Sequence, residues 1–278
     1  MVRAPLAGID MSRPTLMGIL NVTPDSFSDG GLFCDVDSAT QQARAMVAAG
    51  ADIIDVGGES TRPGADIVEI EEEIRRVSGP IAAVAGALGV PISIDTRKAP
   101  VAEAALAAGA RIVNDVSGFT FDANLAFLCA AHHTPVCVMH AQGDPQTMQD
   151  APSYDDVRFD VYDFLAGRVT YLESLGLNRS QIMIDPGIGF GKTMDHNLAL
   201  LREISLLHGL GCPIMLGASR KRFIGVLSGA DSADTRMPGS VAVALHAATQ
   251  GVQVIRVHDV LETRQALALW RAIEFGDT

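Results

Sequence analysis

The chain of 278 residues carries a formal net charge of −12, with 48% hydrophobic and 19% charged residues. This composition can bury a large core, and it differs from the polar, low-complexity composition of disordered chains. The acidic balance argues against a general nucleic-acid surface, because binding phosphates along a nucleic acid requires a basic stripe. Any anion that the protein binds must therefore meet a local basic cluster.

The cysteines and the apolar runs indicate in which cellular compartment the protein is expected. The chain contains four scattered cysteines: Cys34, Cys129, Cys137 and Cys212. Without a C-x-x-C pair they suggest neither a disulfide framework nor a zinc ribbon, and they fit a reducing cytoplasm. The longest nearly apolar run, 80–92, is too short to span a bilayer, and residues 1–14 lack the apolar region of a signal peptide. We expect a cytoplasmic protein that does not contact a membrane.

Short apolar runs rich in Ile and Val recur along the chain and predict eight strands. In chain order they cover residues 15–20, 53–56, 91–94, 111–114, 135–139, 182–184, 213–216 and 252–257. They lack the alternation of apolar and polar residues that marks a half-exposed strand. Such runs are typical of a parallel sheet that is buried on both faces.

Helical patterns lie between the predicted strands. Apolar residues at helical spacing predict a helix from 70 to 88, and glutamates at 69 and 71–73 occupy its first turn, where the helix dipole favours them. Ser38 predicts the start of an earlier helix that ends at Gly50. Pro100 and Gly109 bound a later helix.

The order of these elements predicts the fold. The segment AAGADIID (48–55) matches AAGARIVN (107–114), so one helix–turn–strand unit is used more than once. Eight strands followed by helices predict an α/β protein, a closed (β/α)8 TIM barrel that forms a single domain over 1–278 with a short N-terminal extension at 1–13. A doubly wound open sheet is the alternative, but no G-x-G-x-x-G motif follows a strand.

In a (β/α)8 barrel the active site lies at the carboxyl ends of the strands. The predicted strands end in polar or ionisable residues, whereas their opposite ends are bland. Asp95, Asn114 and Asp185 offer acceptors and an amide group to a heterocycle that carries several N–H donors. Each could instead be a helix cap, but three such residues together favour a binding site.

A second set of strand-end residues is cationic and consists of Arg62, Lys221, Arg256 and His258. These side chains can bind a phosphate or a diphosphate. The glycine-rich stretch 185–193 lacks the spacing of a P-loop, so its glycines indicate close approach of the backbone to a ring, with Phe190 presenting one face. The two sets imply a substrate with an aminopyrimidine-like ring and a diphosphate.

Several long motifs in this chain resemble those of a known family. They are MGILNVTPDSFSDGG (17–31), DVGGESTRPGA (55–65), IDTRK (94–98), VNDVSG (113–118), IDPGIGFGKT (184–193), SRKRFIG (219–225) and RVHD (256–259). From about residue 14 to the C-terminus the chain resembles dihydropteroate synthase, a folate-pathway enzyme. The resemblance implies a (β/α)8 barrel that joins 6-hydroxymethyl-7,8-dihydropterin diphosphate to 4-aminobenzoate and releases pyrophosphate by a dissociative substitution.

The resemblance also implies roles for individual residues. The implied substrate-binding set is Asn21, Phe27, Thr61, Arg62, Pro63, Asp95, Asn114, Met139, Asp185, Phe190, Ser219, Lys221, Arg256 and His258. Asp95, Lys221 and Arg256 would be the catalytic residues within it. Asn21 would bind a Mg²⁺ cofactor together with the pyrophosphate.

The resemblance assigns the substrate-binding residues to different parts of the two substrates. The pterin would be bound by Asp95, Asn114, Asp185 and Lys221. The diphosphate would be held by Arg256 and His258. The aminobenzoate site would be formed by Thr61, Arg62, Pro63, Phe27, Phe190 and Ser219. Segments 21–31 and 57–65, rich in Gly, Pro and Ser, are expected to act as lids over this site.

The implied partners are the two small-molecule substrates and a second copy of the chain in a homodimer, with sulfonamides as competitors of 4-aminobenzoate. Two departures from the family pattern, Ala141 and Arg222, are expected to alter loop packing rather than chemistry. A pterin-dependent methyltransferase is one alternative, which Lys221 and Arg256 argue against. A non-catalytic barrel homologue is the other, and the intact motifs oppose it.

Overall fold

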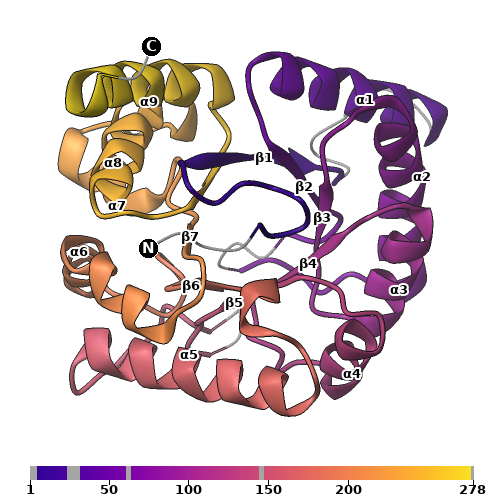
Figure 1. The fold of residues 1–278 in the computed structure, drawn as a ribbon, viewed down its shortest axis with the longest axis horizontal. Helices are drawn as coiled ribbons and strands as arrows, with labels where there is room; N and C mark the ends of the chain where they lie inside the picture. Colours follow the sequence, from indigo (N-terminus) through magenta and orange to yellow (C-terminus); the bar gives the residue numbers. More distant parts are fainter. Residues whose placement is uncertain (1–4, 24–31, 61–63, 144–146, 277–278) are drawn as a thin grey trace.

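A computed structural model describes residues 5–23, 32–60, 64–143 and 147–276, and it describes side chains in these ranges apart from 32–35. Eight parallel strands form the centre of the molecule, and helices surround them (Figure 1). No helix in these ranges is long and apolar enough to cross a membrane. The predicted α/β barrel is confirmed.

The strands follow one another around the barrel in sequence order. They are β1 (Thr15–Asn21), β2 (Ile53–Gly57), β3 (Ile92–Asp95), β4 (Ile112–Asp115), β5 (Val136–Met139), β6 (Ile182–Asp185), β7 (Met215–Leu216) and β8 (Val254–Val257). Hydrogen bonding runs in the order β6-β5-β4-β3-β2-β1-β8-β7. An isolated parallel bridge between Ile184 and Ile214 links the β6 and β7 sides.

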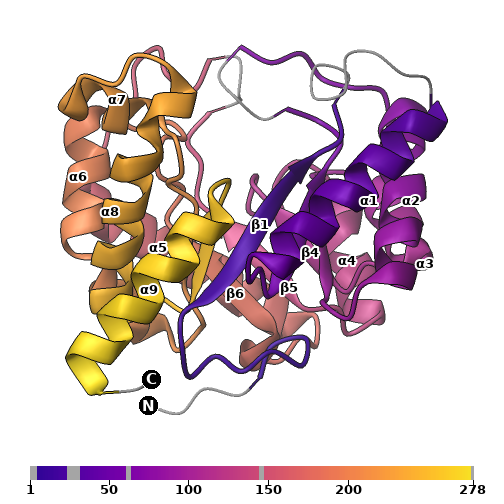
Figure 2. The same ribbon diagram turned by 90° about the horizontal axis from the view of Figure 1, so that it is seen from above.

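The helices cover the outside of the barrel. They are α1 (Leu32–Ala48), α2 (Ile70–Ala87), α3 (Ala99–Ala108), α4 (Ala123–Ala131), α5 (Val157–Ser174), α6 (Met194–Arg202), α7 (Arg222–Ser228), α8 (Met237–Thr249) and α9 (Val260–Phe275), with short 3-10 helices η2 (Arg179–Gln181), η3 (Ile204–Leu210) and η4 (Ala233–Arg236). Figure 2 shows β1 running between α1 and α9. The regular alternation of strand and helix gives the buried, parallel sheet expected from the apolar runs.

Local sequence signals located most elements but misplaced one boundary. Helix α3 begins at Ala99 and stops before Gly109, which adopts a left-handed φ of 115° as the stop signal predicts. Helix α1, however, begins at Leu32 rather than at Ser38. The prediction was wrong because Ser38 is exposed on the helix, where a serine is tolerated without starting it.

The N-terminal extension takes part in the barrel core. Leu6 and Met11 are 1% and 3% exposed and belong to one apolar cluster with residues from the beginnings of the strands, including Met17 and Ile53. Apolar side chains from the extension therefore close the amino end of the barrel. The polar carboxyl ends of the strands lie at the opposite end.

Candidate active site

The strand register places the predicted site residues at one level of the barrel. Asn21 lies opposite Gly57, Gly57 opposite Asp95, and Asp95 opposite Asn114. On the other side of the barrel Met139 lies opposite Asp185. Because neighbouring parallel strands end together, side chains far apart in the sequence share one face.

Arg256 lies at the centre of this face. Its Nε donates to Asp55 Oδ2 at 2.6 Å, and its Nη2 donates to Asp95 Oδ2 at 2.8 Å. Asn114 Nδ2 also donates to Asp55 Oδ2, at 3.2 Å. We call Asp55, Asp95, Asn114 and Arg256 the central cluster. Asp55 was missing from the predicted set, although it lies near the end of a buried strand run as Asp95 does.

The central cluster has more acceptors than donors. Asp55 Oδ1, Asp95 Oδ1 and Asn114 Oδ1 are buried and lack a hydrogen-bond partner among the described residues. Leaving a buried acceptor unpaired costs about 1–3 kcal/mol, so such groups are uncommon in folded proteins. A ligand that presents several N–H donors to this face would satisfy all three oxygens.

Burial raises the pKa values of two carboxyl groups in and beside the central cluster. Burial raises the pKa of Asp95 to about 7, because the Arg256 guanidinium offsets only part of the cost and the Asp55 carboxylate adds to it. Burial also raises the pKa of Asp185, against the opposing effects of Lys221 and of a hydrogen bond from the Gly187 N–H. The two carboxyl groups would be stabilised in their ionised form by a ligand that becomes positively charged.

Asp185 and Arg256 face the same small space beside β7. A Cβ atom on Gly217 would lie 3.6 Å from Asp185 Oδ2 and 3.8 Å from Arg256 Cδ. The Gly187 N–H, at 2.7 Å from Asp185 Oδ1, holds that carboxylate in place. Asp185 therefore joins the central cluster at one site, as the sequence predicted.

Lys221 packs against the ring that was expected to face a heterocycle. Its Nζ lies 4.5 Å from the centre of the Phe190 ring and donates to the Ile188 carbonyl oxygen. Burial lowers the pKa of Lys221 to about 8, partly offset by Asp185. Phe190 and Lys221 thus form one side of the face.

The glycines of 185–193 allow two loops to touch, which the sequence did not reveal. A Cβ on Gly187 would lie 1.8 Å from the His140 carbonyl oxygen, and one on Gly191 would lie 2.3 Å from the Gln142 carbonyl oxygen. Both glycines also have positive φ. The glycines at 187 and 191 are therefore required by contact between the backbones of the loops after β5 and β6, and not only by the approach of a ring.

Lys192 reinforces this contact and was not among the predicted residues. It is 3% exposed, and its Nζ lies 2.8 Å from His140 Nδ1 and 3.0 Å from the Phe190 carbonyl oxygen. Burial lowers the pKa of His140 to about 3, so the ring is neutral and its Nδ1 can accept a hydrogen bond from the Lys192 amino group, whose own pKa burial lowers well below the usual value. A lysine in a glycine-rich loop is usually solvated. Only the burial of Lys192 in the structure shows that it joins the loops after β5 and β6.

Ser219 and His258 meet at the β7–β8 side of the face. The His258 backbone N–H lies 3.2 Å from Ser219 Oγ, and His258 Nδ1 lies 3.0 Å from the same oxygen. Of the two residues expected to hold a diphosphate, His258 lies beside Ser219, whereas Arg256 bonds Asp55 and Asp95. Pairing of Arg256 with these carboxylates was not foreseen.

The oxygen of Asn21 lies beside the central cluster. A Cβ on Gly57 would lie 3.7 Å from both Asn21 Oδ1 and Asp95 Cβ, so the absence of a side chain leaves a cradle between the two residues. The described residues contain no group of three or more His, Cys, Asp or Glu side chains that could hold a metal by themselves. One carboxamide oxygen fits Mg²⁺, which commonly keeps several waters and binds substrate phosphates.

Four predicted site residues lie outside the described residues. They are Phe27, Thr61, Arg62 and Pro63. The remaining predicted residues all lie at the carboxyl ends of the strands or in the loops that follow them.

Comparisons with known proteins agree with this geometry. The sequence pattern of the family "Pterin binding enzyme" matches residues 17–258. A dihydropteroate synthase of Escherichia coli K12 is 45% identical over 264 residues, which cover 95% of this chain and 93% of that protein. The solved structure of Xanthomonas albilineans dihydropteroate synthase with 4-aminobenzoic acid has a TM-score of 0.92 at 43% identity, covering 99% of this chain and 98% of that one. The Yersinia pestis enzyme in complex with a sulfonamide drug has a TM-score of 0.90 at 44% identity, covering 95% and 96%.

Proposed function

Because the chain belongs to the pterin-binding enzyme family and, within it, to the dihydropteroate synthases, we propose that it joins (7,8-dihydropterin-6-yl)methyl diphosphate to 4-aminobenzoate. The products are 7,8-dihydropteroate and pyrophosphate, and the enzyme is a transferase. The relatives named above are synthases, so a methyltransferase or a non-catalytic homologue is not favoured.

The unpaired acceptors of the central cluster carry the assignment of the pterin site. The aminopyrimidine part of a pterin presents several N–H donors along one edge of a flat ring, which matches buried oxygens on Asp55, Asp95 and Asn114. Asp185 supplies a further carboxylate beside Arg256. Phe190 and Lys221 would cover the ring from the side, and Met139 would border it.

The diphosphate would lie at the part of the face formed by the ends of β7, β8 and β1. His258 and Ser219 offer donors there, and the guanidinium of Arg256 in the central cluster adds positive charge. Asn21 Oδ1 is the protein oxygen that would hold Mg²⁺. When bound, the ion would neutralise charge that develops on the departing pyrophosphate.

The reaction requires one bond to break before another forms. The methylene C–O bond breaks and its electron pair leaves with pyrophosphate, so the pterin-methyl group becomes cationic. The amine lone pair of 4-aminobenzoate then forms the new C–N bond, and the nitrogen releases a proton to solvent. The carboxylates of the central cluster stabilise the cation, because they outnumber the single guanidinium of Arg256.

The second substrate would bind after the first. Phe190 and Ser219 border the side where the amine must approach, and the resemblance adds Phe27, Thr61, Arg62 and Pro63. A sulfonamide, as an analogue of 4-aminobenzoate, should compete for this site. Ordered binding predicts that 4-aminobenzoate binds tightly only when pyrophosphate or the pterin diphosphate is present.

We also propose a cytoplasmic homodimer. Cys129, Cys137 and Cys212 are buried, and no disulfide joins cysteines within the described ranges, which fits a reducing compartment. Apolar side chains are exposed on α7 and on α9, including Val226, Leu227, Leu269 and Ile273. Analytical ultracentrifugation tests this proposal, since a monomer at micromolar concentration would contradict it.

The proposed reaction is tested by following pyrophosphate release and dihydropteroate formation with purified protein, both substrates and Mg²⁺. Pyrophosphate should appear in equal amount to dihydropteroate and only when both substrates are present. Chelation of Mg²⁺ should abolish release. Release without 4-aminobenzoate at the same rate would indicate a hydrolase and contradict the proposal.

A further inference from the structure

The loop after β6 contains a buried lysine to which the proposed reaction assigns no role. Lys192 is 3% exposed, and its Nζ lies 2.8 Å from His140 Nδ1, 3.0 Å from the Phe190 carbonyl oxygen and 3.3 Å from the His140 carbonyl oxygen. These hydrogen-bond partners, the ones it has in the described part of the chain, are all uncharged. Lys192 is therefore held by neutral groups from two loops, those after β5 and β6.

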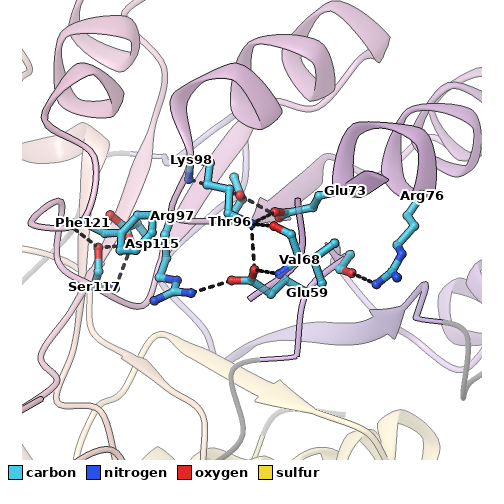
Figure 3. A network of polar contacts seen from close by, with 11 residues as sticks. Glu59, Val68, Glu73, Arg76, Thr96, Arg97, Lys98, Asp115, Ser117 and Phe121 are labelled. Carbon is cyan, nitrogen blue, oxygen red and sulfur yellow. Dashed lines mark hydrogen bonds and ion pairs between the residues drawn. The ribbon is translucent and has the colours of Figure 1, made fainter. Parts of the chain in front are cut away.

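Lys98 is buried to a similar extent but is paired differently. Figure 3 shows its Nζ in contact with two carboxylates, at 2.7 Å from Glu59 Oε2 and 2.6 Å from Glu73 Oε2. These carboxylates offset the cost of burying the charge of Lys98. Burial of the Lys192 amino group is not offset by an ion pair with any described residue, and its pKa is lowered well below the usual value. A lysine that is costly to bury at its position is suited to a role other than stabilising the fold.

The contact with His140 gives Lys192 a fixed reference at the end of β5. The His140 backbone N–H donates to the Asp185 carbonyl oxygen at 3.0 Å, which continues the pairing of β5 with β6. The His140 ring packs edge-on against Phe164 of α5, with 4.9 Å between the ring centres. Because its backbone and its ring are both held, Nδ1 has a defined position. Lys192 therefore binds a group whose position is determined by the barrel.

The contact with Phe190 connects Lys192 to the central face. Two residues earlier in the same loop, the Ile188 carbonyl oxygen accepts a hydrogen bond from Lys221 Nζ, which also lies 4.5 Å from the centre of the Phe190 ring. Burial raises the pKa of Asp185 and the charge of Lys221 opposes the rise, so these two side chains lie close together. Contacts among described residues thus run from Lys192 through Phe190 and Lys221 to a carboxylate of the site.

We propose that Lys192 is a positioning residue for the side of the pterin site that Phe190 and Lys221 form. The inference rests on the proposed function, since it takes the pterin as the ring that binds beside the central cluster. The Phe190 side chain is partly exposed, and the bond from Lys192 to its carbonyl group fixes the backbone that orients the ring. Without this bond, binding of the pterin would have to order Phe190 and Lys221 at a cost in affinity.

Lys192→Met is the first test variant. Methionine has a similar length and brings no charge into the buried position, so the variant should fold. Titration calorimetry with 6-hydroxymethyl-7,8-dihydropterin, which lacks a leaving group, measures binding of the ring without turnover. The variant should bind it about tenfold more weakly than wild type, since small displacements of binding groups have effects of this size. Pyrophosphate with Mg²⁺ should bind within about twofold of wild type, because Ser219 and His258 bond to each other rather than to this loop.

Two substitutions of His140 form a matched pair. Both remove the ring that packs against Phe164, but asparagine can place its Oδ1 where Nδ1 lies and still accept a hydrogen bond from Lys192, whereas leucine cannot. His140→Asn should therefore bind the dihydropterin about fivefold more tightly than His140→Leu. Loss of ring packing cannot produce this difference, because both variants share it. The pair also tests the proposal if Lys192→Met does not fold.

His208→Leu is the control for a loss of stability alone. His208 Nε2 lies 2.9 Å from the Gln250 carbonyl oxygen, and both residues precede strands β7 and β8 at the amino end of the barrel. Its replacement should lower the melting temperature without changing the affinity for the dihydropterin. The positioning role is wrong if the affinities of Lys192→Met for dihydropterin and pyrophosphate fall equally, or if the two His140 variants bind the dihydropterin equally.

The binding measurements separate this inference from the proposed reaction, because they need no turnover. Absence of pyrophosphate release by wild type in the presence of both substrates and Mg²⁺ would overturn the proposed function. Equal affinities of wild type and Lys192→Met for the dihydropterin would instead overturn the role of Lys192 and leave the proposed reaction intact.

Discussion

The central cluster adjoins a flanking cluster of buried charges, Glu59, Glu73, Arg97 and Lys98, at the end of β3, where Asp95 belongs to the first cluster and Arg97 and Lys98 to the second. The charges of the two clusters are matched differently. In the central cluster two carboxylates share one guanidinium and three acceptor oxygens lack partners in the described structure. In the flanking cluster two carboxylates face two cations. An unmatched cluster is suited to a ligand that brings the missing donors and charge, whereas a matched one is suited to holding the chain in position.

The pKa values of one carboxyl group from each cluster are shifted in opposite directions. The pKa of Asp95 is raised to about 7, and the pKa of Glu59 is lowered. Both residues are buried, so burial alone does not decide the direction. At Glu59 the hydrogen bonds from Lys98 and Arg97 outweigh the effect of burial, whereas at Asp95 the Arg256 guanidinium does not outweigh burial and the neighbouring Asp55 carboxylate.

Asp95→Asn should produce the largest effect. We expect turnover to fall by about a thousandfold, because a charge that stabilises the pterin cation at about 4 Å is worth about 4 kcal/mol. The variant should remain folded, since Asp55 still pairs with Arg256. Steady-state kinetics check this, and turnover equal to wild type would show that Asp95 is not catalytic.

The same variant should change how stability depends on pH. The unfolded state releases the Asp95 proton near pH 3.9, but the folded state keeps it up to about 7, so the contribution of this group to stability declines across that range. The amide of the Asp95→Asn variant does not titrate and lacks this decline. The melting temperature of the variant relative to wild type should therefore rise from about pH 4 to about pH 8. Calorimetric scans at several pH values measure the difference.

Glu59→Gln should break the matched cluster and act mainly on stability. The free energy of unfolding at pH 7 should fall by about 3 kcal/mol, because Arg97 and Lys98 lose a buried partner. Since the folded pKa of Glu59 is depressed, its contribution is present above about pH 4.3 and is lost as the pH falls through the folded pKa.

Urea denaturation measures this loss, with Asp234→Asn as the control. Asp234 pairs with Arg220 at the surface and its side chain is 85% exposed, so its replacement should cost less than about 1 kcal/mol. Equal losses in the two variants would mean that the flanking cluster has no more effect than a surface ion pair.

A pH profile of kcat/KM for the pterin diphosphate should report the ionisation of two site residues, Asp95 and Lys221. Ionisation of Asp95 predicts a rise through about pH 7, and deprotonation of Lys221 predicts a fall through about pH 8. Lys221→Arg should remove the falling limb, because an arginine stays protonated over this range. A fall that persists in that variant would assign the limb to another group.

Gly217→Ala should give the smallest effect. The added methyl group would lie in ordinary contact distance of Asp185 and Arg256, so the fold should tolerate it. It would nevertheless occupy space beside the pterin site. We expect KM for the pterin diphosphate to rise by about threefold to tenfold with little change in melting temperature. An unchanged KM would show that the ring does not approach β7.

Local sequence patterns were enough to predict the architecture and three of the carboxyl-end residues that the structure brings together. Apolar runs and helical stripes are local signals, and their regular alternation leaves few topologies open. Asp95, Asn114 and Asp185 were recognised because each lies where a buried strand ends, and parallel strands end at the same face. Long motifs then identified the family.

The pairing of individual charges could be read only from the folded arrangement of the side chains. Arg256 binds Asp55 across 201 positions of sequence, and Lys98 binds Glu59 across 39. Glu73 seemed a dipole-favoured glutamate on a helix surface, yet it is fully buried in the flanking cluster. Pairing depends on distances of a few ångströms between side chains from different elements, and no local pattern encodes such distances. For this reason the sequence predicted which residues meet at the site, but not which of them are neutralised and which are left for a ligand.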